Sequence, residues 1–319
     1  MDKLKKFTES LLNSEIKDFY QLSGGASAET YRLTLPNNQN YILRRTPDSS
    51  EAKLAISKKL EAKIQKIVKQ NNVPVPEIFY DFDETSGFGS GYVMEFISGE
   101  TIPRKILRDD RFKKVRPTIA FKMGEILAKI HQSDISNLQE LKKMSFGQSL
   151  DELYKVYSSF NEPQPVFEYA FNFLAKQNLQ NSNNVLVHGD YRLGNFIISE
   201  NSLSSVIDWE LSHIGSPLED LSWLCVKSWR FGNNTKRAAG LGSLDELLKG
   251  YQSKSFIQID LNELDTWQIY GSLRWGVICM IQTFHHLNNG FNSIEKAAIG
   301  RRVSETEFDL MNMIKNNKF

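Results

Sequence analysis

The stretch HGDYRLGN, residues 188 to 195, gathers a histidine, an aspartate, an arginine and an asparagine within eight residues. A second aspartate, Asp208, follows downstream in Asp208-Trp209-Glu210. One carboxylate, that of Asp190, could accept a proton from a hydroxyl group. The amide oxygen of Asn195 and the carboxylate of Asp208 could hold Mg²⁺, which prefers oxygen ligands. An oriented nucleophile and a metal ion beside nucleotide phosphates are what phosphoryl transfer requires.

Short strands are predicted on both sides of this stretch, in NVLVH, NFIIS and SSVID. A segment so rich in hydrogen-bonding groups makes a poor core strand, so residues 188 to 195 are predicted to form a loop. Strands that flank a loop can bring Asp190, Asn195 and Asp208 into one site. We expect His188 to support the loop through hydrogen bonds; a role as proton shuttle is the alternative.

The first 97 residues have an α+β pattern. Alternating apolar and polar residues predict five short strands, in FYQLSGG, ETYRLTLP, NQNYILRRT, PEIFYDFD and GYVMEFI. The charged segment 51–70 has apolar residues at helical spacing. Its helix should end before Val73-Pro74-Val75-Pro76, because residues that precede proline are pushed out of the α region.

After Gly99 the pattern becomes mainly helical, which predicts a small β-rich lobe at residues 1–97 and a larger helical lobe at residues 98–319. The helices are expected at about 111–133, 148–160, 163–179, 217–230, 244–254, 261–287 and 304–315.

A glycine-containing turn, Ser23-Gly24-Gly25-Ala26-Ser27, lies between the first two predicted strands. Glycines let backbone N–H groups approach phosphates closely, and the Ser27 hydroxyl could add a donor. The segment lacks the G-K-[ST] ending of a Walker A motif. We expect this segment to be a loop that covers the nucleotide, with a simple hairpin turn as the alternative.

The spacing HGD-x-x-x-x-N followed by D-W-E resembles the aminoglycoside phosphotransferase and choline kinase-like superfamily. In protein kinases the same loop has the sequence H-R-D-x-x-x-x-N, and the metal-binding aspartate is the first residue of D-F-G. The resemblance extends over nearly the whole chain. Later segments of the chain are similar to those of a bacterial branch related to the kinase-like portion of acyl-CoA dehydrogenase fusion proteins. The matching segments are LSGGASAETYRL, YILRR, EAKIQKIVKQNNVPVPEIF, GYVMEFISGE, WELSHIGSPLEDLSWL and AAIGRRVSETEFDLM.

This resemblance implies a bilobal, protein-kinase-like fold that binds ATP or GTP with Mg²⁺. It implies that Asp190 is the catalytic base and that Asn195 and Asp208 are metal ligands. Kinases carry a phosphate-binding lysine on the third strand, whereas this chain has Arg44 at that position. Arginine remains charged and can donate two hydrogen bonds to a phosphate or carboxylate; a solvated pair of edge-strand arginines is the alternative.

Several supporting roles follow from the same resemblance. Glu61 is the expected helix partner of Arg44, with Glu51 as the alternative. Met94, Glu95 and Ile97 correspond to the hinge, where backbone groups of Glu95 and Ile97 would bind the edge of adenine. The helix start Ser216-Pro217-Leu218-Glu219 precedes Asp220, which braces the catalytic loop in related folds; simple exposure of Asp220 is the alternative.

Composition excludes some classes of protein. The chain has 319 residues with a formal net charge of +1, without the basic excess typical of nucleic-acid binders. Cys225 and Cys279 lie in apolar segments and are expected to be reduced core residues of a cytoplasmic protein. The charged N-terminal segment lacks the features of a signal peptide, and no apolar run is long enough to span a membrane.

The phosphate acceptor is less well defined by the sequence. Basic residues cluster in the helical lobe, and cations lining the acceptor site would favour a neutral or anionic hydroxyl compound such as a hydroxyacyl thioester. Scattered surface charges, or pairs with Glu305 and Glu307, are the alternative. Aminoglycoside resistance and a non-catalytic nucleotide-binding regulator remain open as functions; the oligomeric state is not predicted. The basic residues are Lys227, Arg230, Lys236, Arg237, Arg274, His285, His286, Arg301 and Arg302.

Overall fold

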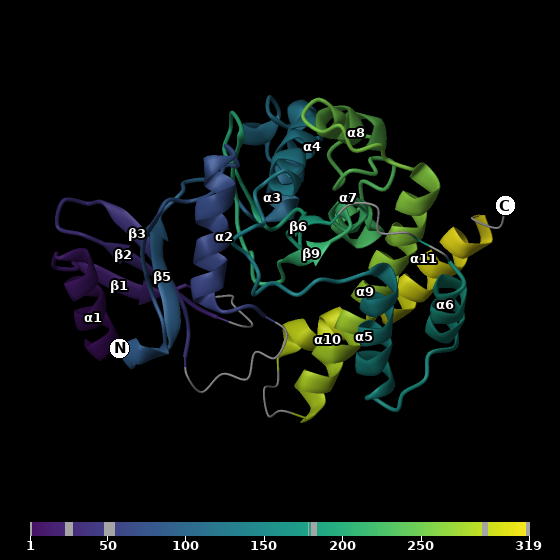
Figure 1. Cartoon of the computed structure of the whole chain (residues 1–319), viewed down its shortest axis with the longest axis horizontal. Coiled ribbons are helices and arrows are strands. Elements are labelled where there is room, and N and C mark those ends of the chain that lie inside the picture. Colours follow the sequence, from purple (N-terminus) through teal and green to yellow (C-terminus); the bar gives the residue numbers. More distant parts are fainter. Residues whose placement is uncertain are drawn as a thin grey trace.

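The N-terminal lobe is built on a five-stranded antiparallel sheet with the order β1-β2-β3-β5-β4 (Figure 1). The computed structural model describes residues 2–22, 28–47, 55–177, 179, 184–288 and 293–316. The five strands predicted from alternation are all present. They are β1 (Asp18–Gln21), β2 (Glu29–Thr34), β3 (Asn40–Thr46), β4 (Ile78–Phe82) and β5 (Ser90–Glu95).

A helix covers each face of this sheet, because successive side chains of a strand point to opposite faces. Helix α1 (Asp2–Leu12) packs on the face that buries Leu33, Leu43 and Val93. Helix α2 (Lys58–Gln70) covers the opposite face, where Tyr92 packs against Ala62. Arg44 points to the α2 side of the sheet, since its Nε lies 3.7 Å from Glu61 Oε1. Helix α2 stands between this sheet and the C-terminal lobe (Figure 1).

Helix α2 begins later than the predicted residue 51. The Ser57 side chain accepts a hydrogen bond from the Leu60 N–H and caps the first turn, so that the helix starts at Lys58. Part of the predicted N-terminal extension, residues 51–54, lies outside the described residues.

The C-terminal lobe is mainly helical and contains one large apolar core. Helix α9, 28 residues long, packs against α7, α10 and α11. Helix α4 packs closely on α8, and a Cβ added at Gly124 would lie 2.0 Å from the Leu247 carbonyl oxygen. The helices are α3 (Pro103–Arg108), α4 (Arg116–His131), α5 (Phe146–Ser158), α6 (Pro165–Ala175), α7 (Pro217–Cys225), α8 (Leu244–Gln252), α9 (Leu261–Asn288), α10 (Ile294–Gly300) and α11 (Val303–Asn316), with 3₁₀ turns η1 (Glu84–Ser86), η2 (Asp110–Phe112) and η3 (Lys227–Arg230).

The C-terminal lobe also contains two short antiparallel sheets. Strand β6 (Val185–Val187) pairs with β9 (His213–Gly215), and β7 (Phe196–Ile198) pairs with β8 (Leu203–Val206). The chain that leaves the N-terminal sheet runs along β7, where the Glu100 N–H donates to the Ile198 carbonyl at 2.9 Å. The Ile56 N–H also donates to the Glu210 carbonyl at 2.9 Å. These backbone hydrogen bonds connect both lobes to the loops that carry the predicted site.

Sequence periodicity missed α1, α3, α10 and the three-residue strand β9, and it placed 217–230 in one helix where the structure has α7 followed by η3. No helix in the described part of the chain is both long and apolar enough to cross a bilayer.

Candidate active site

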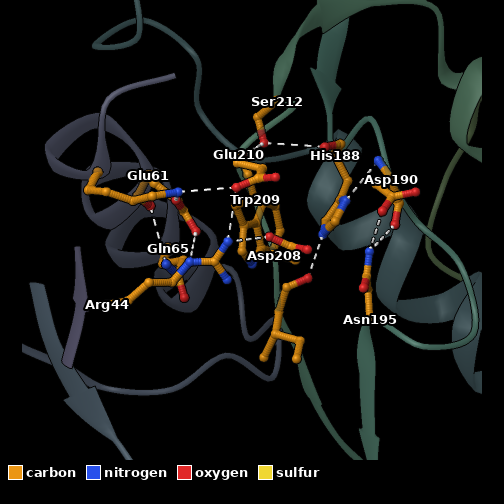
Figure 2. Close-up of polar contacts among 12 residues, drawn as sticks. Arg44, Glu61, Gln65, His188, Asp190, Asn195, Asp208, Trp209, Glu210 and Ser212 are labelled. Carbon is orange, nitrogen blue, oxygen red and sulfur yellow. Dashed lines mark hydrogen bonds and ion pairs between the residues drawn. The ribbon is translucent and has the colours of Figure 1, made fainter. Parts of the chain in front are cut away.

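Asp190 lies in the loop between β6 and β7, with its carboxylate held by three neighbouring side chains. Asn195 donates through Nδ2 to the Asp190 carbonyl oxygen at 2.9 Å and to Oδ2 at 2.6 Å (Figure 2). Trp223 Nε1 and Arg192 Nε donate to Oδ1 at 2.8 and 2.9 Å. The side chain remains 15% exposed. The carboxylate is thus fixed in orientation and still reachable by a small molecule.

Asn195 and Asp208 lie at the same end of the β7–β8 hairpin. Asn195 precedes β7, Asp208 follows β8, and the Ile207 N–H donates to the Asn195 carbonyl at 3.0 Å. Because the Asn195 amide nitrogen faces Asp190, the amide oxygen is the atom of this side chain left to face a cation. Asp208 has a φ of 71°, a left-handed conformation that non-glycine residues adopt mainly at specialised sites. The three side chains predicted to work together therefore lie in one region (Figure 2).

His188 is fully buried and connects the loop to the hairpin. Its Nδ1 accepts a hydrogen bond from the Asp190 N–H at 3.2 Å, which places the ring proton on Nε2. Nε2 then donates to the Ile207 carbonyl at 3.2 Å (Figure 2). Both ring nitrogens are occupied by backbone groups, an arrangement that favours support of the loop over proton transfer.

Asp220, in the first turn of α7, is fully buried beneath the same loop. Its carboxylate accepts hydrogen bonds from the N–H groups of His188 at 2.8 Å and Gly189 at 3.0 Å, and it contacts His131 Nε2 at 3.2 Å. Burial alone would raise the pKa of Asp220, but the hydrogen bond and charge of His131 and the backbone donor lower it. Gly189 has a φ of 82°, and a Cβ there would lie 2.3 Å from the Leu211 carbonyl oxygen. The loop thus depends on both the buried carboxylate and the glycine.

Replacing Asp220 with Asn is expected to destabilise the fold by about 3 kcal/mol at neutral pH, because an amide nitrogen would face backbone donors that the carboxylate now satisfies. The lowered pKa means that Asp220 stabilises the fold above the unfolded pKa of about 3.9, and that this contribution is lost as pH falls through the folded pKa. Urea unfolding of both proteins from pH 7 towards pH 3 should show the stability difference shrinking in acid. The exposed Asp245→Asn change is the control, and an equal difference at all pH values would contradict this role.

Arg44 lies in a buried ionic cluster between the lobes. One of its terminal nitrogens, Nη2, donates to Asp208 and, at 3.1 Å, to Glu210, while Nε lies 3.7 Å from Glu61 Oε1 (Figure 2). Burial raises the pKa of Asp208, but the charge and hydrogen bond of Arg44, with a contribution from Lys58, lower it overall. Asp208 is thus ionised, as a metal ligand must be. The sequence pointed to the Arg44–Glu61 pair, whereas the contact of Arg44 with the predicted metal ligand comes only from the structure.

The structure does not describe the loop predicted to cover the nucleotide or the alternative glutamate of the helix. Ser23, Gly24, Gly25 and Ser27 lie outside the described residues, as does the alternative glutamate Glu51.

The predicted hinge follows directly on the sheet. Met94 and Glu95 end β5, and Ile97 lies just beyond it. The Glu95 N–H donates to the Glu77 carbonyl at 2.8 Å. This hydrogen bond occupies one of the backbone groups predicted for adenine, so the Ile97 N–H becomes the better candidate donor.

Most of the basic residues highlighted in the helical lobe have local partners. Lys227 pairs with Asp309 and Arg237 with Asp265. Arg302 pairs with Glu305 at the surface. Arg274 is different, since Nη2 donates to the Gly189 carbonyl at 3.0 Å and Nη1 lies 3.3 Å from Glu219.

Two residues near Asp190 were missed by sequence reasoning, Arg192 and Trp223. Arg192 is inside the quoted HGDYRLGN stretch, and Trp223 is one helical turn after Asp220. The Arg192 guanidinium lies 4.6 Å from the ring centre of Trp229, and that of Arg274 lies 4.7 Å from the ring centre of Trp223. Next to the candidate base, two guanidinium groups thus lie over buried indole rings, and each is paired with a carboxylate, Arg192 with Asp190 and Arg274 with Glu219.

Residues 18–255 match the model of the phosphotransferase enzyme family. The chain is 25% identical over 296 residues to acyl-CoA dehydrogenase family member 10 of Mus musculus, covering 84% of this chain but only 26% of that relative. It therefore spans about a quarter of the relative's length.

Solved structures show the same fold. A crystal structure of a putative aminoglycoside phosphotransferase from Ralstonia eutropha superimposes with a TM-score of 0.78 at 21% identity, covering 98% of each chain. A spectinomycin phosphotransferase in complex with ADP and spectinomycin has a TM-score of 0.67 at 16% identity, covering 97% of this chain and 98% of that one. The bilobal, protein-kinase-like architecture predicted from the sequence is thus confirmed.

Proposed function

Because this chain belongs to the phosphotransferase enzyme family, we propose that it transfers the γ-phosphate of ATP, or of GTP, to a hydroxyl group of a small molecule. The observation that carries the proposal is the convergence of Asp190, Asn195 and Asp208 beside Arg44. These residues combine a fixed base, oxygen ligands and a phosphate-binding cation. The solved relative that holds ADP supports a nucleotide as donor.

The donor set fits Mg²⁺. The described residues contain no group of three or more His, Cys, Asp or Glu side chains able to hold a metal by themselves. Mg²⁺ in phosphoryl-transfer sites is held by one or two protein oxygens together with phosphates and water. The amide oxygen of Asn195 and the carboxylate of Asp208 would supply those protein ligands. The ion would neutralise charge on the nucleotide phosphates.

The residues of the chain itself would perform the remaining steps. Asp190 would accept the proton of the acceptor hydroxyl as its oxygen forms a bond to the γ-phosphorus and the bond to the nucleoside diphosphate breaks. Asn195 and Trp223 keep the carboxylate aimed at that proton. Arg44 would move from Asp208 to the phosphates. Positioning and charge neutralisation would supply most of the rate.

We further propose that the acceptor is a neutral or anionic hydroxyl compound, such as a hydroxyacyl thioester. Arg192 and Arg274 place two guanidinium groups beside Asp190, where a polycationic acceptor would bring further positive charge next to the pairs Arg192–Asp190 and Arg274–Glu219. Trp223 and Trp229 are buried and pack against each other under these two guanidinium groups. An aminoglycoside acceptor, which would seek carboxylates, is the second candidate.

A substrate panel tests both the proposed phosphoryl transfer and the proposed class of acceptor. The enzyme is incubated with ATP, Mg²⁺ and separate hydroxy acids, hydroxyacyl thioesters, neutral alcohols and aminoglycosides, and phosphorylated product is identified by mass spectrometry. Product from the first three classes is expected. Product from aminoglycosides alone would reverse the acceptor proposal. Nucleotide binding without any product would favour a non-catalytic regulator, for which the contact of Arg44 with Asp208 would be the structural argument.

A further inference from the structure

Lys58 is a buried lysine at the centre of the ionic cluster between the lobes. Its side chain is 1% exposed, and Nζ donates to Glu61 Oε2 at 2.6 Å and to Glu210 Oε2 at 3.3 Å. Lysine is almost never this buried unless it is paired. Lys58 also lies in the first turn of α2, where the helix dipole disfavours a cation. Neither burial nor helix formation explains this residue, so its explanation lies in the carboxylates that it contacts.

The hydrogen bonds of Glu61 show which of the two cations it contacts directly. Oε2 accepts from Lys58, and Oε1 accepts from the Tyr92 hydroxyl at 2.8 Å. Arg44 Nε lies 3.7 Å away and, among the described residues, has no hydrogen-bond partner although it is buried. Lys58, rather than the strand arginine, is therefore the cation bonded directly to the helix glutamate.

The charges of the cluster change when nucleotide binds. In the structure, Arg44 and Lys58 face three carboxylates, those of Glu61, Asp208 and Glu210. Under the proposed function, Arg44 leaves Asp208 and Glu210 for the phosphates while Asp208 takes up the metal. Glu61 and Glu210 would then keep their contacts with Lys58. A buried carboxylate that loses its partner is strongly disfavoured.

On the basis of the proposed function, we propose that Lys58 is a positioning residue for nucleotide phosphates, which fixes and neutralises Glu61 and Glu210 so that Arg44 can exchange Asp208 for the nucleotide. Lys58 does not itself touch the nucleotide in this scheme. Its loss would weaken the binding of the phosphates and leave the adenine contacts at the hinge unchanged.

The test compares the binding of Mg²⁺-ATP and of adenosine, which lacks phosphates, by calorimetry or competition. In Lys58→Met the Kd of Mg²⁺-ATP is expected to rise at least about tenfold, whereas that of adenosine stays close to the wild-type value. Lys59→Met is the matched control, because Lys59 is the next residue of the helix, is 58% exposed and pairs with Asp83 at the surface. It should leave both values unchanged.

Lys58→Arg retains the positive charge and provides the same comparison if the Met variant does not fold; its Kd for Mg²⁺-ATP should lie between those of wild type and Met. Unchanged Mg²⁺-ATP binding in these variants would overturn the proposal. Equal weakening of ATP and adenosine would also overturn it, since that result marks a purely structural role. If the wild-type protein binds no Mg²⁺-ATP, the proposed function fails rather than the role of Lys58.

Discussion

An Asp190→Asn enzyme is expected to retain nucleotide binding but to lose phosphoryl transfer, with kcat lowered by about 10²–10⁴-fold, the usual contribution of a general base. The amide has the shape of the carboxylate and can still accept the hydrogen bond that Trp223 Nε1 gives to Oδ1. It cannot take up the proton of the acceptor hydroxyl. Single-turnover measurement of phosphorylated product, with Mg²⁺-ATP affinity measured in parallel, separates the chemical step from binding.

The Asp245→Asn variant is a suitable control, because Asp245 is a highly exposed carboxylate on the same lobe that pairs with Lys249 at the surface. Its kcat should equal that of wild type. A kcat for Asp190→Asn within a few-fold of wild type would exclude Asp190 as the base. Loss of nucleotide affinity together with kcat would instead indicate a collapsed loop, since Asn195 and Arg192 both depend on Asp190 for their positions.

Local patterns account for the parts of the fold and site that could be predicted. Strand alternation predicted all five strands of the N-terminal sheet, and it implies that Arg44 and its neighbour Arg45 point to opposite faces. The structure agrees, since Arg44 faces Glu61 whereas Arg45 bonds Glu29. Asn195 and Asp208 are brought together by the short β7–β8 hairpin, so their placement is largely a property of neighbouring sequence.

Contacts between distant segments could not be predicted in the same way. Lys58 appears in the sequence as one charge among many on a charged helix, and its burial depends on Glu210 in the other lobe. The contact of Arg44 with Asp208 joins the third strand to the end of β8. Trp223 reaches Asp190 because α7 packs beneath the loop. No spacing rule connects such residues, because tertiary packing alone brings them together.

Under the proposed function, a metal ion would compete with the Arg44 guanidinium for the carboxylate of Asp208. In this arrangement the arginine holds Asp208 ionised and in place before the metal and nucleotide arrive. Mg²⁺ with its bound phosphates would offer Asp208 a divalent partner and Arg44 a new anion at the same time. Such an exchange couples metal binding to phosphate binding, so each should strengthen the other.

Replacing Asp208 with Asn should abolish this coupling, with kcat/KM for Mg²⁺-ATP falling by at least about 10³-fold, because the ionised ligand of the metal is lost. Mg²⁺ should no longer strengthen ATP binding, which calorimetry with and without the ion would measure. The fold should change little in stability, since the variant leaves Glu61 and Glu210 facing Arg44 and Lys58, two carboxylates for two cations.

That combination of lost activity and retained stability separates Asp208 from a structural aspartate such as Asp220, whose replacement should affect unfolding. Asp81→Asn, at a surface position of the N-terminal sheet paired with Lys66, serves as the control and should alter neither quantity. Retained Mg²⁺ dependence in Asp208→Asn would show that the metal is held elsewhere. A large loss of stability would instead show that Arg44 needs Asp208 mainly to join the two lobes, and the exchange of partners by Arg44 would then be wrong.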